Sequence, residues 1–183
     1  METLHLFGAR ATFFVIAPLA LRFPRLIHQM ICAGHSVELH CAKHLRHTEL
    51  TYQEVEVDAR SGLRDLRALG MLPRLWRPPW GIVTPWTQAV AKDLGLELVC
   101  WTVDTHDWRG DTTAEMLDYI SPDLQPGSVI LMHDGLGPGA RRSGCQETVA
   151  TCALRGALSR RRCRRAPSTS SSPRRFCTIC RAR

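Results

Sequence analysis

The sequence has no aspartate before Asp58, and its last 33 residues contain no acidic residue at all. Long hydrophobic runs are also missing. The longest, Ala11–Leu21, is about half of the roughly 20 residues that a membrane-spanning helix needs. Glu2 and His5 stand where a secretory signal would have its basic segment, so we expect neither a transmembrane helix nor a signal peptide. With 44% hydrophobic residues and 13 glycines in 183, the composition excludes wholesale disorder and collagen-like repeats and predicts one globular domain.

The net charge of +7 comes entirely from the C-terminal segment. Residues 151–183 hold ten arginines, whereas residues 1–150 hold 14 basic and 17 acidic residues, a net charge of −3. We therefore predict a mildly acidic domain at residues 1–150, with no nucleic acid among its partners.

Residues 151–183 are predicted to form a basic, disordered tail rich in Arg, Ser and Cys, because they show no hydrophobic periodicity. Two explanations of this composition stay open. A basic tail could attract nucleic acid or an anionic wall polymer, whereas a shifted reading frame of GC-rich coding DNA yields the same residue types. We favour the frameshift. Cys177 and Cys180 have zinc-knuckle spacing, but no second ligand pair accompanies them.

Strand-like and helix-like segments alternate from residue 11 to residue 133. Apolar and β-branched runs predict strands at residues 11–16, 36–40, 75–77, 97–103 and 128–133. Helical spacing and end signals predict helices at residues 23–33, 51–69, 86–94 and 112–120. The second helix starts with a capping box made by Thr51 and Glu54. This rhythm indicates an α/β fold with a mainly parallel sheet and outer helices, either doubly wound or a barrel.

Four groups of polar residues directly follow predicted strands, where α/β folds place their functional sites. They are the pair His40 and His44, the loop Arg77–Gly81, the segment Asp104–Trp108 and the pair His133 and Asp134. Because the carboxyl ends of parallel strands meet at one edge of a sheet, we expect the four groups to converge.

His40 and His44 are four residues apart, a spacing that puts two imidazoles on one side of a helical turn and lets them bind one metal ion. The same spacing occurs in solvated helices that bind no metal. Two histidines also leave a third ligand to come from elsewhere in the chain.

The loop and the last pair supply two further candidate groups. Trp80 has the first backbone N–H after two prolines, which makes it a candidate oxyanion donor. His133 follows the last predicted strand, and an aspartate beside it would keep its imidazole protonated near neutral pH, as a general acid requires. A structural histidine at the edge of the core explains that pair equally well.

Five segments occur in an order and spacing that resembles the polysaccharide deacetylase family, the NodB homology domain of carbohydrate esterase family 4. They are Gly8–Val15, Gly34–His44, Arg77–Gly81, Asp104–Trp108 and Leu131–His133, and the resemblance covers about residues 3–150. It implies an irregular (β/α) barrel and metal-assisted hydrolysis of N-acetyl or O-acetyl groups. The implied partner is an acetylated polysaccharide such as chitooligosaccharide, peptidoglycan or xylan, and the implied cofactor is a divalent metal, zinc above all.

The resemblance also implies roles for particular residues. His40 and His44 correspond to the two metal-binding histidines. Arg77 corresponds to the arginine that orients the catalytic base, and Trp80 to the residue whose N–H binds the oxyanion and whose ring binds substrate.

The last two segments carry the remaining implied roles. Asp107 corresponds to the carboxylate that tunes His133, the general acid for the leaving amine. Trp108 and Leu131 correspond to the walls of the small apolar pocket that accepts the acetyl methyl group.

The chain departs from the family at both ends. The family opens with a strand ending in Thr-Phe-Asp-Asp-Gly, whose first aspartate is the base and whose second is the third metal ligand. No aspartate before Asp58 can replace them. The family's last strand and helix would follow Gln146–Val149, where the Arg-rich tail stands instead. We therefore expect an incomplete barrel that lacks its first strand by truncation and its last strand and helix by frameshift, with little or no deacetylase activity.

Two other functional interpretations stay open. A non-catalytic remnant could keep a sugar-binding groove lined by Trp80 and Trp108. A decayed gene product would not fold stably, because missing barrel strands expose unpaired edges. The family commonly acts outside the cytoplasm or at the cell wall, which is the location that the resemblance implies.

Overall fold

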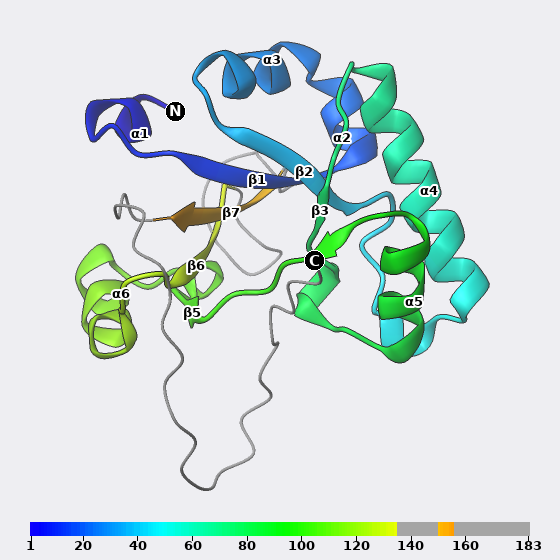
Figure 1. Ribbon diagram of the computed structural model, residues 1–183. Helices are drawn as coiled ribbons and strands as arrows, with labels where there is room; N and C mark the ends of the chain where they lie inside the picture. The colour runs from blue at the N-terminus through cyan, green and yellow to red at the C-terminus, as the bar shows by residue number, and fades with distance from the viewer. Residues whose placement is uncertain (135–149, 156–183) are drawn as a thin grey trace, which may run out of the picture.

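The computed structural model describes residues 1–134 and 150–155 of the chain (Figure 1). The strands are β1 (Ala11–Ile16), β2 (Ser36–Cys41), β3 (Leu75–Trp76), β4 (Glu97–Leu98), β5 (Val103–Asp104), β6 (Val129–His133) and β7 (Ala150–Arg155). The α-helices are α1 (Glu2–Leu6), α2 (Ala17–Arg22), α3 (Pro24–Cys32), α4 (Tyr52–Ala68), α5 (Pro85–Asp93) and α6 (Thr113–Ile120). Four short 3₁₀ helices lie between them, η1 (His47–Glu49), η2 (Pro79–Gly81), η3 (Asp107–Arg109) and η4 (Ser121–Asp123).

The strands form one sheet in the order β4-β3-β2-β1-β7-β6-β5. The pairs β1–β2, β2–β3, β3–β4 and β5–β6 are parallel, and β7 is antiparallel to both β1 and β6. It follows that β1 and β6 run in the same direction. The carboxyl ends of β2, β3, β5 and β6 therefore share one edge of the sheet, as the sequence predicted.

The sheet curls into a barrel because its two edge strands are consecutive in the chain. Only residues 99–102 separate β4 from β5, and at roughly 3.5 Å per extended residue the two edges stay within about 20 Å of each other. The N–H of Val99 still donates to the carbonyl of Trp76 (2.9 Å), and that of Thr102 donates to Val129 (2.9 Å). The strand predicted at 97–103 is therefore interrupted at residues 100–101, where the chain changes neighbours from β3 to β6.

Strand β7 fills the place between β1 and β6. Its register sets Cys152 opposite Phe13 on one side and Ala153 opposite Leu131 on the other. Here the structure differs from the prediction of a disordered tail, since residues 151–155 are a strand. The physical reason is that β1 and β6 would otherwise leave rows of unpaired N–H and C=O groups. Residues 156–183 of the predicted tail lie outside the described residues.

The helices pack on the outside of the sheet. Helix α4 lies against β2 and α2, and α5 lies against α4 (Figure 1). Helix α4 begins with the predicted capping box: Glu54 N–H donates to Thr51 Oγ1 (3.3 Å), and Thr51 N–H donates to Glu54 Oε2 (2.7 Å). No helix within the described residues is both long and apolar enough to cross a membrane.

Alternation along β1 divides the core into two clusters. Phe13 and Val15 pack with Leu39 and Trp76 in the cluster that lies under the outer helices. Phe14 points the other way, into a second cluster with Val99 that also contacts side chains of β3 and β6. Since these strands are not neighbours of β1 in the sheet, the second cluster is the interior of the barrel.

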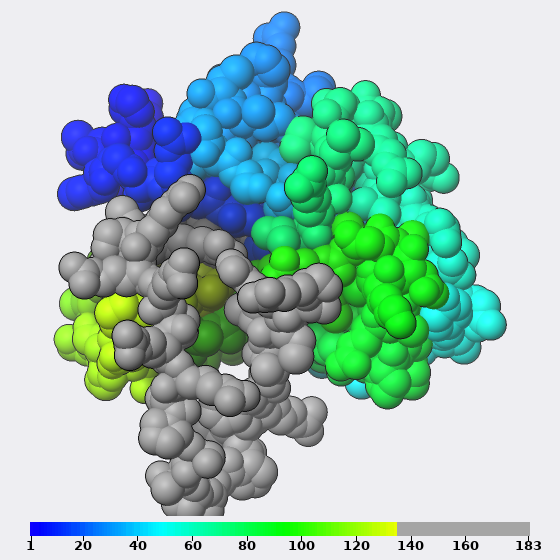
Figure 2. Space-filling model, in the orientation of Figure 1, coloured from blue at the N-terminus to red at the C-terminus, as the bar shows by residue number. Residues whose placement is uncertain are grey.

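Helix α1 stands at the edge of the molecule. The dark blue residues at the start of the chain protrude beside the light blue residues of α2 and α3 (Figure 2). Helix α1 has no buried residue, and the side chains of Leu6 and Phe7 are 78% and 77% exposed. The fold therefore depends little on α1, and its N-terminal anchor is β1.

A buried histidine predicts a dependence of stability on pH. His47 is 1% exposed, its Nδ1 is 2.9 Å from Thr87 Oγ1, and burial lowers its pKa to about 4. In the unfolded chain the His47 imidazole has a pKa near 6.5. Between pH 6.5 and pH 4 the imidazole is therefore protonated in the unfolded state and neutral in the folded state. The free energy of unfolding should fall by up to about 3 kcal/mol between pH 6.5 and pH 4.

Urea denaturation at a series of pH values measures this loss. His47→Gln should make the dependence less steep, with the lowered pKa values of His40 and His44 accounting for part of what remains, and His5→Gln on the exposed surface of α1 should leave it unchanged. An equally steep acid dependence in the His47→Gln variant would contradict the assignment.

Candidate active site

Side chains at the carboxyl ends of β2, β3, β5 and β6 form one rim. We call it the site rim, and its residues are His40, His44, Trp80, Asp107 and His133. The His40 and His44 rings lie 5.1 Å apart, and the His44 ring is 4.2 Å from that of Trp80. A charge on His133 lowers the pKa of both His40 and His44, which places His133 near them. The structure thus brings together three of the groups that the sequence singled out, and Asp107 joins them through His133.

His40 is buried at the end of β2 and is fixed by hydrogen bonds on both sides. Its Nδ1 donates to the carbonyl of Arg77 (2.5 Å), and its own carbonyl accepts from Trp76 Nε1 (2.9 Å). Because a carbonyl only accepts, the proton is on Nδ1 and the lone pair of Nε2 stays available. Burial, opposed in part by the Arg77 hydrogen bond, lowers the pKa of His40 to about 3, so the ring is neutral at neutral pH.

His44 is not on a helix. The chain leaves β2 at Cys41 and bends at residues 42 and 43, so the helical turn expected from the His40–His44 spacing is not formed. The loop instead brings the two rings together from a strand end and a bend. Partial burial and the positive charges of His133 and Arg46 lower the pKa of His44, which favours its neutral form.

Two charged residues outside the predicted set lie at this part of the site. Arg46 lies over the Trp80 ring, with its guanidinium carbon 4.5 Å from the ring centroid. Asp58 of α4 accepts hydrogen bonds from the loop backbone. The signal for Asp58 was in the sequence, because it is an acidic residue on the buried face of an amphipathic helix, between Val55 and Leu63.

Arg77 is 1% exposed and runs behind the site rim. Its guanidinium donates to the carbonyls of Val99 and Cys100 (both 3.3 Å) and lies 4.3 Å from the ring of Phe14. These contacts fix the side chain inside the barrel mouth, while its carbonyl orients His40. The predicted role of Arg77 in orienting a catalytic base stays a prediction.

Trp80 has a backbone conformation that few non-glycine residues adopt, with φ of 53°. Such strain at a site needs support from its surroundings. Gly81 also has positive φ, and a Cβ there would come within 2.6 Å of the Trp101 ring, so the turn packs tightly on that ring. The role of the Trp80 N–H as an oxyanion donor stays a prediction.

Asp107 and His133, which the resemblance relates to each other, form a hydrogen-bonded pair, and the role of His133 as a general acid stays a prediction. His133 Nδ1 is 2.7 Å from Asp107 Oδ1, and the His133 backbone N–H donates to Asp107 Oδ2 (2.5 Å). Burial alone would raise the pKa of Asp107, but these hydrogen bonds and the charge of His133 lower it below its usual value. Asp107 therefore favours its ionised form, and its two oxygens hold the imidazole and the backbone N–H of His133.

The residues predicted to form an acetyl pocket lie on adjoining elements. Leu131 is 4% exposed in β6, whereas Trp108 in η3 is 49% exposed, with the Arg109 guanidinium carbon 5.2 Å from its ring centroid. The β6–η3 junction is fixed by the Asp107–His133 pair. A shared apolar pocket of Trp108 and Leu131 stays a prediction.

The site rim fits a divalent metal ion in part. Two neutral imidazoles face each other, and the Nδ1 proton of His40 leaves its Nε2 as the ligand atom. Among the described side chains of residues 1–134, however, no three from His, Cys, Asp or Glu are placed to share one ion. The described residues therefore offer two of the ligands that a metal site of this kind needs.

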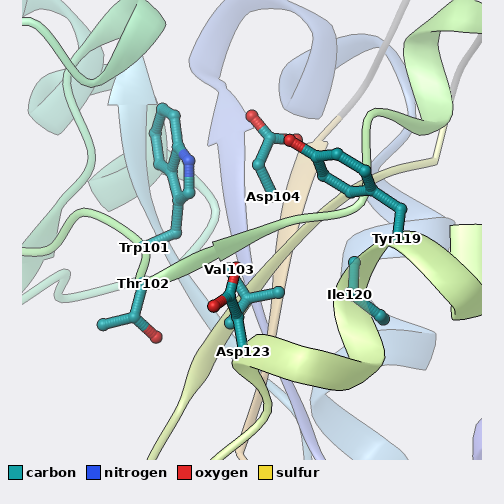
Figure 3. A pocket seen from close by; sticks show the side chains of 7 residues that line it. All are labelled: Trp101, Thr102, Val103, Asp104, Tyr119, Ile120 and Asp123. Carbon is teal, nitrogen blue, oxygen red and sulfur yellow. The ribbon is translucent and has the colours of Figure 1, made fainter.

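A pocket of about 240 Å³ lies beside the site rim, between β5 and α6 (Figure 3). Trp101 and Tyr119 stand on opposite sides of the β5 segment in this view. The pocket is lined by Trp101, Thr102, Val103, Asp104, Tyr119, Ile120 and Asp123. None of the eight predicted site residues is among them, so this pocket is distinct from the predicted acetyl pocket.

Known proteins are similar to this chain in sequence. A family model described as polysaccharide deacetylase matches residues 1–99. The chitooligosaccharide deacetylase of Bradyrhizobium sp. (strain ANU 289) is 34% identical over 135 residues, which are 73% of this chain and 62% of that protein. The peptidoglycan-N-acetylglucosamine deacetylase of Bacillus cereus is 29% identical over 137 residues, or 74% of this chain and 64% of that protein. The chain thus spans less than two thirds of either relative.

A solved structure shares the fold. The family 4 carbohydrate esterase from Streptomyces lividans, in complex with acetate, is 31% identical, with a TM-score of 0.69 over 73% of this chain and 70% of that chain. The fold expected from the sequence, an α/β barrel of the deacetylase type, is confirmed.

Proposed function

The chain belongs to the polysaccharide deacetylase family, and we propose that its site rim is built for metal-dependent hydrolysis of N-acetyl or O-acetyl groups on a polysaccharide such as chitooligosaccharide or peptidoglycan. One observation carries the proposal. The imidazole pair of His40 and His44 and the hydrogen-bonded pair of His133 and Asp107 lie close enough for their charges to interact. A metal-binding pair beside an acid–carboxylate pair is the arrangement that metal-assisted hydrolysis requires.

Each group has a distinct role in this proposal. His40 and His44 would hold the divalent metal, zinc in this proposal, which when bound would activate a water molecule or polarise the acetyl carbonyl. The backbone N–H of Trp80 would donate to the oxyanion. His133, held by Asp107, would give its proton to the leaving nitrogen or oxygen of the sugar.

We also propose that this chain catalyses the reaction weakly or not at all. The reaction needs a carboxylate that takes a proton from water, and the family's Asp-Asp motif has no counterpart before Asp58. Losing a general base typically lowers the rate by about 10²–10⁴-fold. A metal held by two imidazoles without the third ligand would also be bound weakly.

Zinc binding should depend on both histidines of the pair. We expect His40→Ala and His44→Ala each to reduce zinc binding by the purified protein below detection, because each removes one of two imidazole ligands. Isothermal titration with zinc chloride, together with metal analysis after dialysis, measures the effect.

Cys41→Ser is the matched control, because Cys41 directly follows His40 in β2 and points to the other face of the strand. This variant should bind zinc as the parent chain does. Unchanged zinc content in both histidine variants would refute the assignment of the pair.

A second candidate function is carbohydrate binding without catalysis. The observation that favours it is the exposure of two tryptophans, Trp80 (44%) and Trp108 (49%), because sugar rings stack on exposed aromatic faces. Titration with chitooligosaccharides beside an acetate-release assay separates the two functions. Saturable binding without acetate release would favour the binding module, whereas metal-dependent acetate release would favour the enzyme.

A further inference from the structure

The bend between His40 and His44 is held by a side chain from another element. The N–H groups of Ala42 and Lys43 donate to the two carboxylate oxygens of Asp58, at 3.0 Å and 2.7 Å. Both oxygens of one carboxylate are used, one for each successive amide. The two amides are the central part of the His40–His44 segment, so Asp58 fixes the backbone that connects the two imidazoles.

Close packing of α4 on β2 lets Asp58 reach the bend. Gly62 lies one helical turn after Asp58 on the same face of α4. A Cβ at Gly62 would come within 2.7 Å of Leu39 Cδ1 and 3.5 Å of the amide nitrogen of Ala42. The glycine therefore allows the helix to approach the strand end closely enough for an aspartate side chain to span the gap.

Burial of the Asp58 carboxyl group on the inner face of α4 is energetically unfavourable. Its neighbours on the buried face are Val55, Ala59 and Gly62, and the residue is only 9% exposed. A carboxylate in such a place is unfavourable unless hydrogen bonds compensate for the loss of water. Burial raises the pKa of Asp58, and the hydrogen bonds from the bend oppose this effect, so they tie the carboxyl group to one backbone conformation.

We propose that Asp58 is a positioning residue of the metal site: its carboxylate holds the bend at Ala42 and Lys43 so that the His44 ring faces that of His40. This inference rests on the proposed function, in which the two imidazoles bind one ion. Asp58 acts through the backbone and does not touch the metal. The asparagine amide tests the role, because it offers one acceptor oxygen and presents an NH₂ group to the other amide donor.

Asp58→Asn is expected to weaken zinc binding by about 10–100-fold, the usual effect of removing a residue that orients metal ligands. Titration with zinc chloride measures the affinity. Glu56→Gln is the matched control on the same helix, where it removes a surface ion pair with Arg60 (2.8 Å) and leaves the bend intact. The control should bind zinc as the parent chain does.

A second measurement is made without metal, so that it stays informative whether or not the chain binds zinc. In the parent chain the Trp80 ring lies 4.2 Å from that of His44, so we expect it to shift the NMR signals of the His44 ring protons. Asp58→Asn should reduce this ring-current shift as the bend relaxes, and Glu56→Gln should preserve it. If the parent chain binds no zinc, the proposed function fails, but the shift still decides the role of Asp58.

Asp58→Glu is the conservative variant and protects the test against a misfolded asparagine variant. It keeps two acceptor oxygens on a side chain one methylene longer, so its zinc affinity and ring-current shift should lie between those of the parent and Asp58→Asn. Parent-like zinc affinity and an unchanged His44 shift in Asp58→Asn would overturn the proposal. So would an Asp58→Glu variant that falls below Asp58→Asn in both measurements.

Discussion

A variant that ends at Val149, and so lacks strand β7, is expected to unfold. Strand β7 pairs through five residues with β1 and through five with β6. Its removal deletes roughly ten backbone hydrogen bonds, each worth about 1 kcal/mol net. Domains of this size are stable by only about 5–15 kcal/mol in total. The loss therefore approaches the whole free energy of unfolding.

The matched control is a variant that ends at Arg155, which deletes residues 156–183 and keeps the strand. We expect this variant to unfold cooperatively at nearly the temperature of the parent chain. Circular dichroism during heating measures both. Cooperative, parent-like melting of the Val149 variant would show that β7 does not stabilise the sheet. The unpaired edges of β1 and β6 would then have to be tolerated without a strand between them.

Local sequence signals located most of the elements correctly because their physical causes are local. The capping box of Thr51 and Glu54 satisfies amides within one turn, so it marks the start of α4 in sequence and structure alike. The β-branched and aromatic residues of the segment Ala11–Ile16 likewise predicted β1 with its bounds. The run that continues into α2 was not predicted as a helix, because its apolar residues and Pro18 suit a strand end as well as a first helical turn.

Features set by tertiary contacts could not be predicted in this way. The spacing of His40 and His44 suggested a helical turn, yet the bend between them depends on Asp58, which lies 14 residues beyond His44 and meets the bend only when α4 packs on β2. The convergence of the strand ends was predictable, since parallel strands share an edge. The pairing of residues 150–155 could not be predicted, because their partners in β1 lie more than 130 residues earlier in the chain.

Adding a strand that ends in Thr-Phe-Asp-Asp-Gly before Met1 is expected to confer metal-dependent deacetylase activity, on condition that β7 is removed. A strand that leads through α1 into β1 and runs parallel to β1 must lie beside it. The two neighbours of β1 are β2 and β7. The parallel pairing with β2 extends from Thr12 to Ile16 of β1, so the added strand can enter only in place of β7.

That position would bring the two aspartates to the site rim. A parallel strand between β1 and β6 has its carboxyl end at the same edge as the ends of β2 and β6, where His40 and His133 lie. The added carboxylates would then supply the two groups that the described residues lack, a proton acceptor for water and a third metal ligand. One added strand would therefore supply both the proton acceptor and the third metal ligand. It would also pair with the two strand edges, of β1 and β6, that deletion of β7 exposes.

Three variants separate these effects: the added strand alone, the added strand on a chain ending at Val149, and the latter with both added aspartates changed to asparagine. The second should fold, although the Val149 truncation alone should not, and it should release acetate from chitooligosaccharides in the presence of zinc at least about 10²-fold faster than the parent chain. The asparagine variant should fold equally well and stay inactive, because its strand pairs but its side chains cannot accept a proton. Equal activity in the asparagine variant, or rapid metal-dependent acetate release by the parent chain, would mean that a carboxylate already present, such as Asp104 or Asp134, fills the role of the base.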